Sequence, residues 1–136
     1  MSSTAKFSAE EKAAMRARAK ELKLAEEGDA AIKAAFKKMS PADRKIAERV
    51  HAVVTDAAPD LTAKTWYGMP AYANKDGKVV IYFRDAGKFK ERYSMLGFND
   101  SSKLDQGSMW PVAYALPKLV KADEAKIKGL VKKAVG

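Results

Sequence analysis

The chain contains no cysteine and a single histidine, His51, among its 136 residues. The lack of cysteine excludes disulfides, zinc–thiolate sites, cysteine nucleophiles and cysteine-held iron–sulfur clusters. No run of about 18 apolar residues, the length of a membrane-spanning helix, occurs in the sequence. The N-terminal segment also lacks the apolar stretch of a secretory signal. We therefore expect a cytoplasmic protein without membrane contact.

Charged residues make up 32% of the sequence and hydrophobic residues 47%, which is typical of a globular domain. The length suits a single domain with its own core. Lys and Arg outnumber Asp and Glu by 26 to 17, so the formal net charge is +9. This excess favours weak binding to polyanions, because cations displace the counterions of phosphates.

Helix-forming residues dominate the first third of the chain. Ser8 and Glu11 form a capping box, and the Ala-, Lys- and Glu-rich segment 9–27 predicts an exposed helix. Gly28 and Asp29 indicate a break, followed by a second helix over 30–39.

Two further helices flank the rest of the chain. Ser40 as N-cap and Pro41 as the first helical residue predict a third helix, which ends before Pro59. A final helix is expected over residues 123–135, with Asp123 as its N-cap.

The middle of the chain alternates apolar and polar residues, as strands do. Strands are expected over 61–68, 92–98 and 108–116, and Asp76-Gly77 predicts a hairpin turn within 71–83. Consecutive hairpin-linked strands give an antiparallel sheet. We expect an α+β fold in which about five strands pack against one helix before them and one C-terminal helix. Residues 1–39 would be a helical extension, and residues 40–136 a single domain.

Catalytic groups are sparse. His51 lies beside the apolar stripe of the third helix and has no nucleophile near it in sequence, so a core-edge or surface role is favoured. The carboxylates are scattered and lack the spacing of a calcium loop. We expect no enzyme activity and predict no catalytic residue.

Aromatic residues gather in the stretch 66–83, which reads WYGMPAYANKDGKVVIYF. Successive strand residues point to opposite faces, so one member of each of the pairs Trp66–Tyr67 and Tyr82–Phe83 should face the helices. The other would lie on the outer face, where uncovered aromatic side chains indicate binding. Core and ligand cleft both stay open as interpretations. The residues expected to line a ligand site are Tyr67, Met69, Tyr72, Tyr82, Trp110 and Tyr114.

Lysines are concentrated near the C-terminus. A solvated face is the ordinary interpretation, and a surface for nucleic-acid phosphates is the alternative. The residues of that surface would be Lys118, Lys121, Lys126, Lys128, Lys132 and Lys133.

The order of these segments resembles the YdhG-like family of small bacterial proteins of unknown function, some of which are described as frataxin-like iron chaperones. The similarity covers roughly residues 40–135. It rests on YGMPAY at 67–72, Gly77 and Lys78 in the hairpin, Gly107, and Leu116-Pro117. The resemblance implies an α+β fold with an antiparallel sheet, and iron as a candidate ligand.

The sequence therefore favours a non-enzymatic binding module that carries a small ligand or metal ion, in the manner of an iron chaperone. The metal-binding residues are unknown. The alternative is a nucleic-acid-associated protein that uses the Lys-rich final helix and the charged N-terminal helix.

Overall fold

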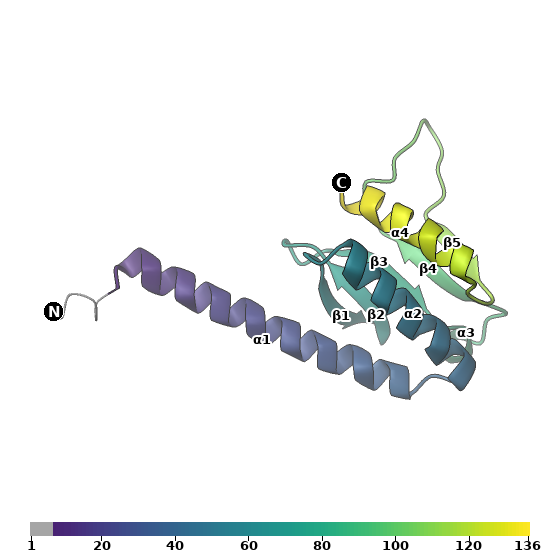
Figure 1. Ribbon diagram of the computed structural model, residues 1–136, viewed down its shortest axis with the longest axis horizontal. Helices are drawn as coiled ribbons and strands as arrows, with labels where there is room; N and C mark the ends of the chain where they lie inside the picture. The colour runs from purple at the N-terminus through teal and green to yellow at the C-terminus, as the bar shows by residue number, and fades with distance from the viewer. Residues whose placement is uncertain (1–6) are drawn as a thin grey trace.

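The computed structural model describes residues 7–136, which form an α+β fold with one antiparallel sheet and the three long helices against one of its faces (Figure 1). The five strands lie in the order β1-β2-β3-β4-β5, so each strand pairs with its neighbour in sequence. The expected fold class is confirmed. The elements are α1 (Ala9–Lys37), α2 (Pro41–Ala57), β1 (Thr62–Trp66), β2 (Met69–Ala73), β3 (Val79–Arg84), α3 (Ala86–Phe89), β4 (Ser94–Phe98), β5 (Ala113–Leu116) and α4 (Lys121–Val135).

α1 is one uninterrupted helix of 29 residues. The expected break at Gly28 and Asp29 and the separate helix over 30–39 are therefore wrong. Gly28 instead allows close packing, because a Cβ atom there would lie 1.7 Å from the backbone oxygen of Ala63 in β1. Gly28 thus lowers the local helix propensity but permits a close contact with a distant strand.

The N-terminal ends of α1 and α2 form as the sequence predicts. The hydroxyl of Ser8 accepts the amide of Glu11 at 3.0 Å, and the Glu11 carboxylate accepts the amide of Ser8. The hydroxyl of Ser40 likewise accepts the amide of Asp43 at 3.2 Å. Both contacts satisfy amides that have no partner within the helix.

The final helix begins two residues earlier than expected. Its N-cap is Val120, and Asp123 lies inside the first turn. The Asp123 carboxylate accepts the amide of Val120 at 3.1 Å. The expected N-cap role of Asp123 is therefore wrong: its side chain reaches back from the third helical position.

Two tight turns join the first three strands. Tyr67 and Gly68 form the two-residue turn between β1 and β2, with φ angles of 51° and 76°. This left-handed backbone suits the twist of a hairpin, and glycine adopts it without strain. In the next turn the Asn74 side chain accepts the amides of Asp76 and Lys78 at 3.0 and 3.1 Å. The hairpin expected around Asp76-Gly77 is confirmed.

The strands after β3 are shorter than expected. The short helix α3 precedes β4, which begins at Ser94 rather than at residue 92. The strand expected over 108–116 is reduced to β5, which begins at Ala113. Pro111, which has no amide hydrogen to donate to the ladder, lies just before it.

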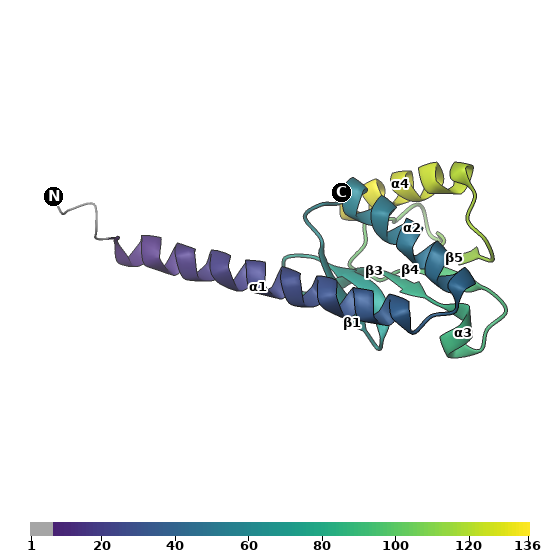
Figure 2. The ribbon, with the colours of Figure 1, turned by 60° about the horizontal axis from the view of Figure 1, so that its bottom comes forward.

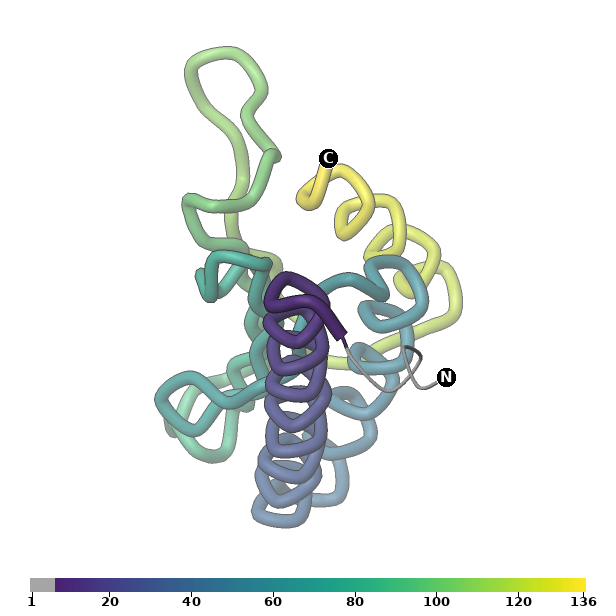
Figure 3. The backbone as a smooth tube through the Cα atoms, turned by 90° about the vertical axis from the view of Figure 1, so that its left-hand side faces the viewer, coloured from purple at the N-terminus to yellow at the C-terminus, as the bar shows by residue number. Residues whose placement is uncertain are grey.

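One face of the sheet is covered by α2, α4 and the C-terminal part of α1 (Figures 2 and 3). Tyr72 of β2 is paired with Ala63 and Ile81 of the adjacent strands, and all three belong to the hydrophobic core. Ile32 and Phe36 of α1 are buried in the same core, so α1 packs as part of the domain from Gly28 onward.

The preceding part of α1, residues 9–27, has no buried residue and extends well past the sheet (Figure 1). We call this segment the helical arm. Its C-terminal neighbour Gly28 contacts the edge strand β1. Among residues 7–136, none of the helices has the length and apolarity needed to cross a bilayer.

Candidate functional site

The outer face of the sheet, opposite the core, carries a cluster of aromatic side chains. Trp66 and Tyr82 come from β1 and β3, and their ring centroids are 5.3 Å apart. Tyr67, in the turn after β1, packs its ring 5.0 Å from that of Trp66 and is 78% exposed. Trp66 and Tyr82 are partly exposed. We call Trp66, Tyr67 and Tyr82 the aromatic cluster.

Small side chains make room for these rings. Ala71 of β2 is paired with Tyr82, lies between the two aromatic strands and is fully buried. Gly97 of β4 is also paired with Tyr82, and a Cβ atom there would lie 2.0 Å from the tyrosine ring. The outer end of the Tyr82 ring therefore lies directly over Gly97. Met69, paired with Trp66, is buried on this face but belongs to no part of the helix-covered core.

Cationic side chains surround the aromatic cluster. Lys64 lies on the outer face because it is paired with Ala71. Arg84 lies two residues beyond Tyr82, with its guanidinium carbon 3.9 Å from the centre of the Phe89 ring, and forms an ion pair with Glu91. The ammonium group of Lys88 donates to the backbone oxygen of Tyr67 at 3.0 Å and so holds a positive charge at the β1–β2 turn.

A hollow of about 510 Å³ lies at one end of this face, next to Trp66. Lys64 and Lys78 contribute positive charge to its wall, and Asp100 contributes one carboxylate. Asn99 and Ser101 also line the hollow, but both side chains donate to the backbone oxygen of Val79 and thereby fix the loop after β4. The remaining lining residues are Gly77 and Val79.

The six residues expected to line a ligand site lie on two sides of the sheet. Tyr67, Met69 and Tyr82 meet on the outer face. Tyr72 is 1% exposed and lies under the helices. Trp110 and Tyr114 pack against the helix-covered core, where the Tyr114 ring meets Phe98 edge to face at 6.1 Å. The structure thus does not bring the six together in one cleft.

Tyr72 forms a polar contact at the edge of the core. Its hydroxyl group shares a hydrogen bond of 2.8 Å with Nδ1 of His51, and the His51 ring also meets Phe36 edge to face. Burial raises the pKa of the Tyr72 hydroxyl well above its usual range. Burial also lowers the pKa of His51, while Asp29 raises it and Lys33 lowers it further. The pair joins α2 to β2.

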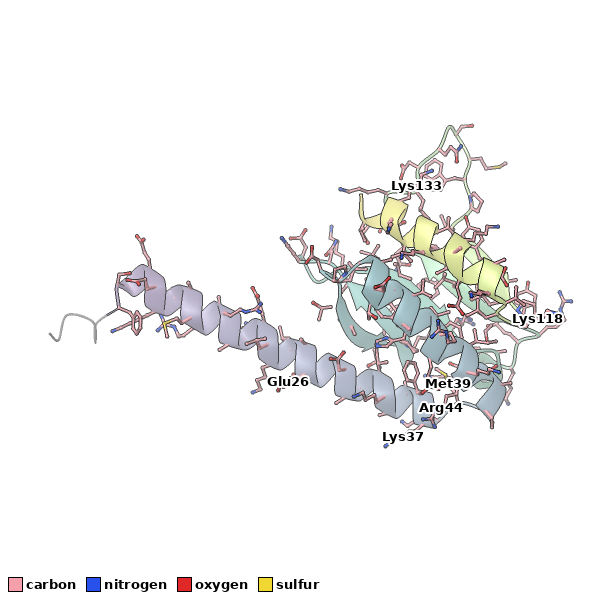
Figure 4. All side chains as sticks on the ribbon, viewed as in Figure 1. Glu26, Lys37, Met39, Arg44, Lys118 and Lys133 are labelled. Carbon is pink, nitrogen blue, oxygen red and sulfur yellow. The ribbon has the colours of Figure 1, made fainter. Side chains whose placement is uncertain are left out.

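The six lysines expected to form a cationic surface divide into separate groups. Lys118 and Lys133 lie at opposite ends of α4 (Figure 4). Lys128 faces α2, where its ammonium group lies 3.3 Å from the Asp56 carboxylate. Lys126 lies on the side of β5, 5.8 Å from the centre of the Tyr114 ring. By their spacing of seven and four residues, Lys121 and Lys132 share the side of Lys128.

Metal-ligating groups are dispersed in the described part of the chain. Residues 7–136 contain no group of three His, Asp or Glu side chains placed to hold one ion. A second hollow, of about 410 Å³, lies between the ends of α2 and α4, the β2–β3 turn and residues 101–103, and none of the six expected ligand residues lines it.

No family model, curated protein or solved structure matches this chain. The YdhG-like resemblance and its implied iron ligand therefore stay predictions. Trp66, Lys64 and the basic side chains near Tyr82 were absent from the expected site, although alternation along β1 and β3 could have placed Trp66, Tyr82, Lys64 and Arg84 on one face. The position of Lys88 beside the β1–β2 turn could not be predicted from strand alternation, because it depends on how α3 packs against that turn.

Proposed function

We propose that this protein binds unpaired nucleic-acid strands on the outer face of its sheet and catalyses no reaction there. The observation that carries the proposal is an uncovered antiparallel face on which Trp66 and Tyr82 lie 5.3 Å apart among cationic side chains. Nucleic-acid association was the alternative function predicted from the sequence. The geometry supports this function but on a different surface. The aromatic and basic groups lie together on the outer face of the sheet rather than on α4.

The chemistry of this face suits a single strand better than a duplex. Exposed rings offer stacking surfaces to unpaired bases, and stacking tolerates any base because every base has a π face. Lys64 and Lys78 lie beside Trp66 in the 510 Å³ hollow, within reach of the phosphates of a strand stacked there. Ala71 and Gly97 let the rings lie close to the sheet, so little side-chain freedom would be lost on binding.

Affinity for a fluorescently labelled 15-nucleotide oligo(dT), measured by anisotropy, tests this proposal. Trp66→Ala and Tyr82→Ala should each weaken binding by about 1–3 kcal/mol, the usual contribution of one stacked base. Trp110→Ala is the matched control, because it removes an aromatic side chain on the other side of the sheet. Equal losses in all three variants, or unchanged affinity in the first two, would contradict the proposal.

Binding of iron or a small ligand, which was the function favoured by the sequence, stays a separate prediction. A ligand that binds only the folded protein raises its melting temperature. A thermal shift with Fe(II) that persists at high salt would support that function, whereas a shift with oligo(dT) that disappears at high salt would support the strand-binding proposal.

A further inference from the structure

The helical arm carries a row of positive charge that the domain does not use. Lys12, Arg16, Lys20 and Lys23 are spaced by four, four and three residues, and all four are exposed. At about 100° per residue they fall within about 80° of one another around the helix axis. We call these four residues the basic row.

The basic row faces away from the domain. Gly28, Ile32 and Phe36 mark the side of α1 that packs against the sheet and core. Continued along the helix, that side lies about 160° from the centre of the basic row. The four cations are therefore open to a partner without any change in the fold.

The acidic residues of the arm leave most of the basic row uncompensated. Glu11 belongs to the capping box, and Glu21 lies 3.4 Å from Arg18, which is on another side of the helix. Within residues 7–136, no member of the basic row forms a salt bridge. Glu27, one turn beyond Lys23, falls within the angular range of the row, and Glu26 lies about 40° outside it, so these two carboxylates flank only the C-terminal end of the row.

Like charges four residues apart destabilise an isolated helix. The steps from Lys12 to Arg16 and from Arg16 to Lys20 are both of this kind. A polyanion laid along the row would turn this repulsion into attraction. The row spans about 16 Å along the axis, which matches about five base pairs of duplex at 3.4 Å each.

We propose that the basic row is a second contact, which holds the phosphate backbone of a duplex next to a single strand on the sheet. This inference rests on the proposed function, because it assigns the neighbouring part of the same nucleic acid to the arm. The arm leaves the domain beside the proposed strand site, because a Cβ atom on Gly28 would lie 3.6 Å from Cα of Lys64, which lines the hollow beside Trp66. Lys23, the member of the row nearest to the domain, lies about 7.5 Å before Gly28 along the axis and on the opposite side of the helix, so the overhang has to pass around the helix between the two contacts. The partner is a duplex with a single-stranded overhang.

The test compares three DNA ligands: oligo(dT) of 15 nucleotides, a 15-base-pair duplex, and that duplex with the oligo(dT) as an overhang. The arm variant combines Lys12→Ala, Arg16→Ala, Lys20→Ala and Lys23→Ala in the full chain. Alanine is the strongest helix former, so the arm stays helical, and far-UV circular dichroism checks this. The matched control removes four other exposed charges, by Lys118→Ala, Lys121→Ala, Lys132→Ala and Lys133→Ala.

The arm variant should bind the overhang duplex at least tenfold more weakly at low salt and bind oligo(dT) within twofold of the unmodified protein. Its plot of log affinity against log salt for the overhang duplex should be less steep by about 3.6, since each lost duplex phosphate contact removes about 0.9. The control should retain the slope of the unmodified protein.

Equal losses in the arm variant and the control would overturn the inference, because the effect would then follow net charge alone. Unchanged affinity of the arm variant for the overhang duplex would overturn it as well. If the unmodified protein fails to bind oligo(dT) but binds the duplex through the arm, the proposed function falls and the arm contact stands. If it binds none of the three ligands, both fall.

Discussion

The two faces of the sheet are built in different ways from neighbouring residues. Phe83 is fully buried in the core with Leu96 of the next strand, under the helices. Tyr82, one residue earlier, lies on the outer face over Gly97 and remains partly exposed. The covered face is filled by large apolar side chains, whereas the outer face places large rings on small residues.

This difference separates the residues that stabilise the fold from the residues proposed to bind a ligand. Side chains of the covered face have lost their contact with water, so the hydrophobic effect acts on them fully. The rings of the outer face keep part of their surface in water and gain correspondingly less from folding. We therefore attribute stability to the covered face and propose the outer face as the binding surface.

The largest expected effect is on stability, from alanine at neighbouring positions of β3. Phe83→Ala should lower the free energy of unfolding by about 3–5 kcal/mol, because it leaves a cavity in the core. Tyr82→Ala should cost clearly less, since its ring is partly exposed and no helix covers it. Urea unfolding followed by circular dichroism measures both. Similar losses in the two variants would remove the distinction between the faces.

A smaller loss is expected where α1 meets β1. Gly28→Ala places a methyl group 1.7 Å from the Ala63 backbone oxygen, and a backbone atom cannot turn away as a side chain can. The strain should cost about 1–3 kcal/mol, more than the gain of about 1 kcal/mol in helix propensity. Ala25→Gly, in the exposed arm, is the control, because it measures the difference in helix propensity between glycine and alanine without a packing contact.

Urea unfolding of both variants gives the comparison. Ala25→Gly should cost only the propensity difference of about 1 kcal/mol, because Ala25 is exposed. A stabilised Gly28→Ala protein would show that α1 does not pack closely against β1 in solution.

The smallest effect is a pH dependence from His51. Its folded pKa lies below the unfolded value, so the unfolded chain takes up a proton first as pH falls through about 6.5. Full stability is therefore present above about pH 6.5 and is lost between that pH and the folded pKa, at no more than about 1.4 kcal/mol per pH unit.

His51→Gln isolates this contribution, since glutamine keeps a polar partner for Tyr72 but does not titrate. The free energy of unfolding of the unmodified protein should fall more steeply from pH 7 to pH 5 than that of the variant. Parallel curves would show that His51 titrates alike in the folded and unfolded chains.

The sequence predicts elements whose causes are local. Ser8 with Glu11, Ser40 with Pro41, and Asp76-Gly77 mark helix starts and a turn, and each acts through residues within a few positions. The helix break predicted at Gly28 was wrong because this glycine packs against Ala63, 35 residues away, and local sequence rules do not include that contact. Long-range packing overrode propensity at this position.

The candidate site was predicted only in part, for a related reason. Alternation correctly separates Tyr82 from Phe83, because both lie within β3. It fails for Trp66 and Tyr67, since Tyr67 lies in the turn and follows no strand face. Placing Tyr72 and Tyr114 under the helices requires the register of three strand pairs, which depends on the whole sheet.

Quenching of Trp66 fluorescence tests the central claim most directly. The chain has two tryptophans, so Trp110→Phe leaves Trp66 as the only one, and Trp66→Phe leaves Trp110 as the matched reporter. On titration with oligo(dT), emission from Trp66 should be quenched as bases stack on its ring, while emission from Trp110 should stay constant. Quenching of Trp110 alone, or of neither tryptophan, would contradict strand binding on the outer face of the sheet.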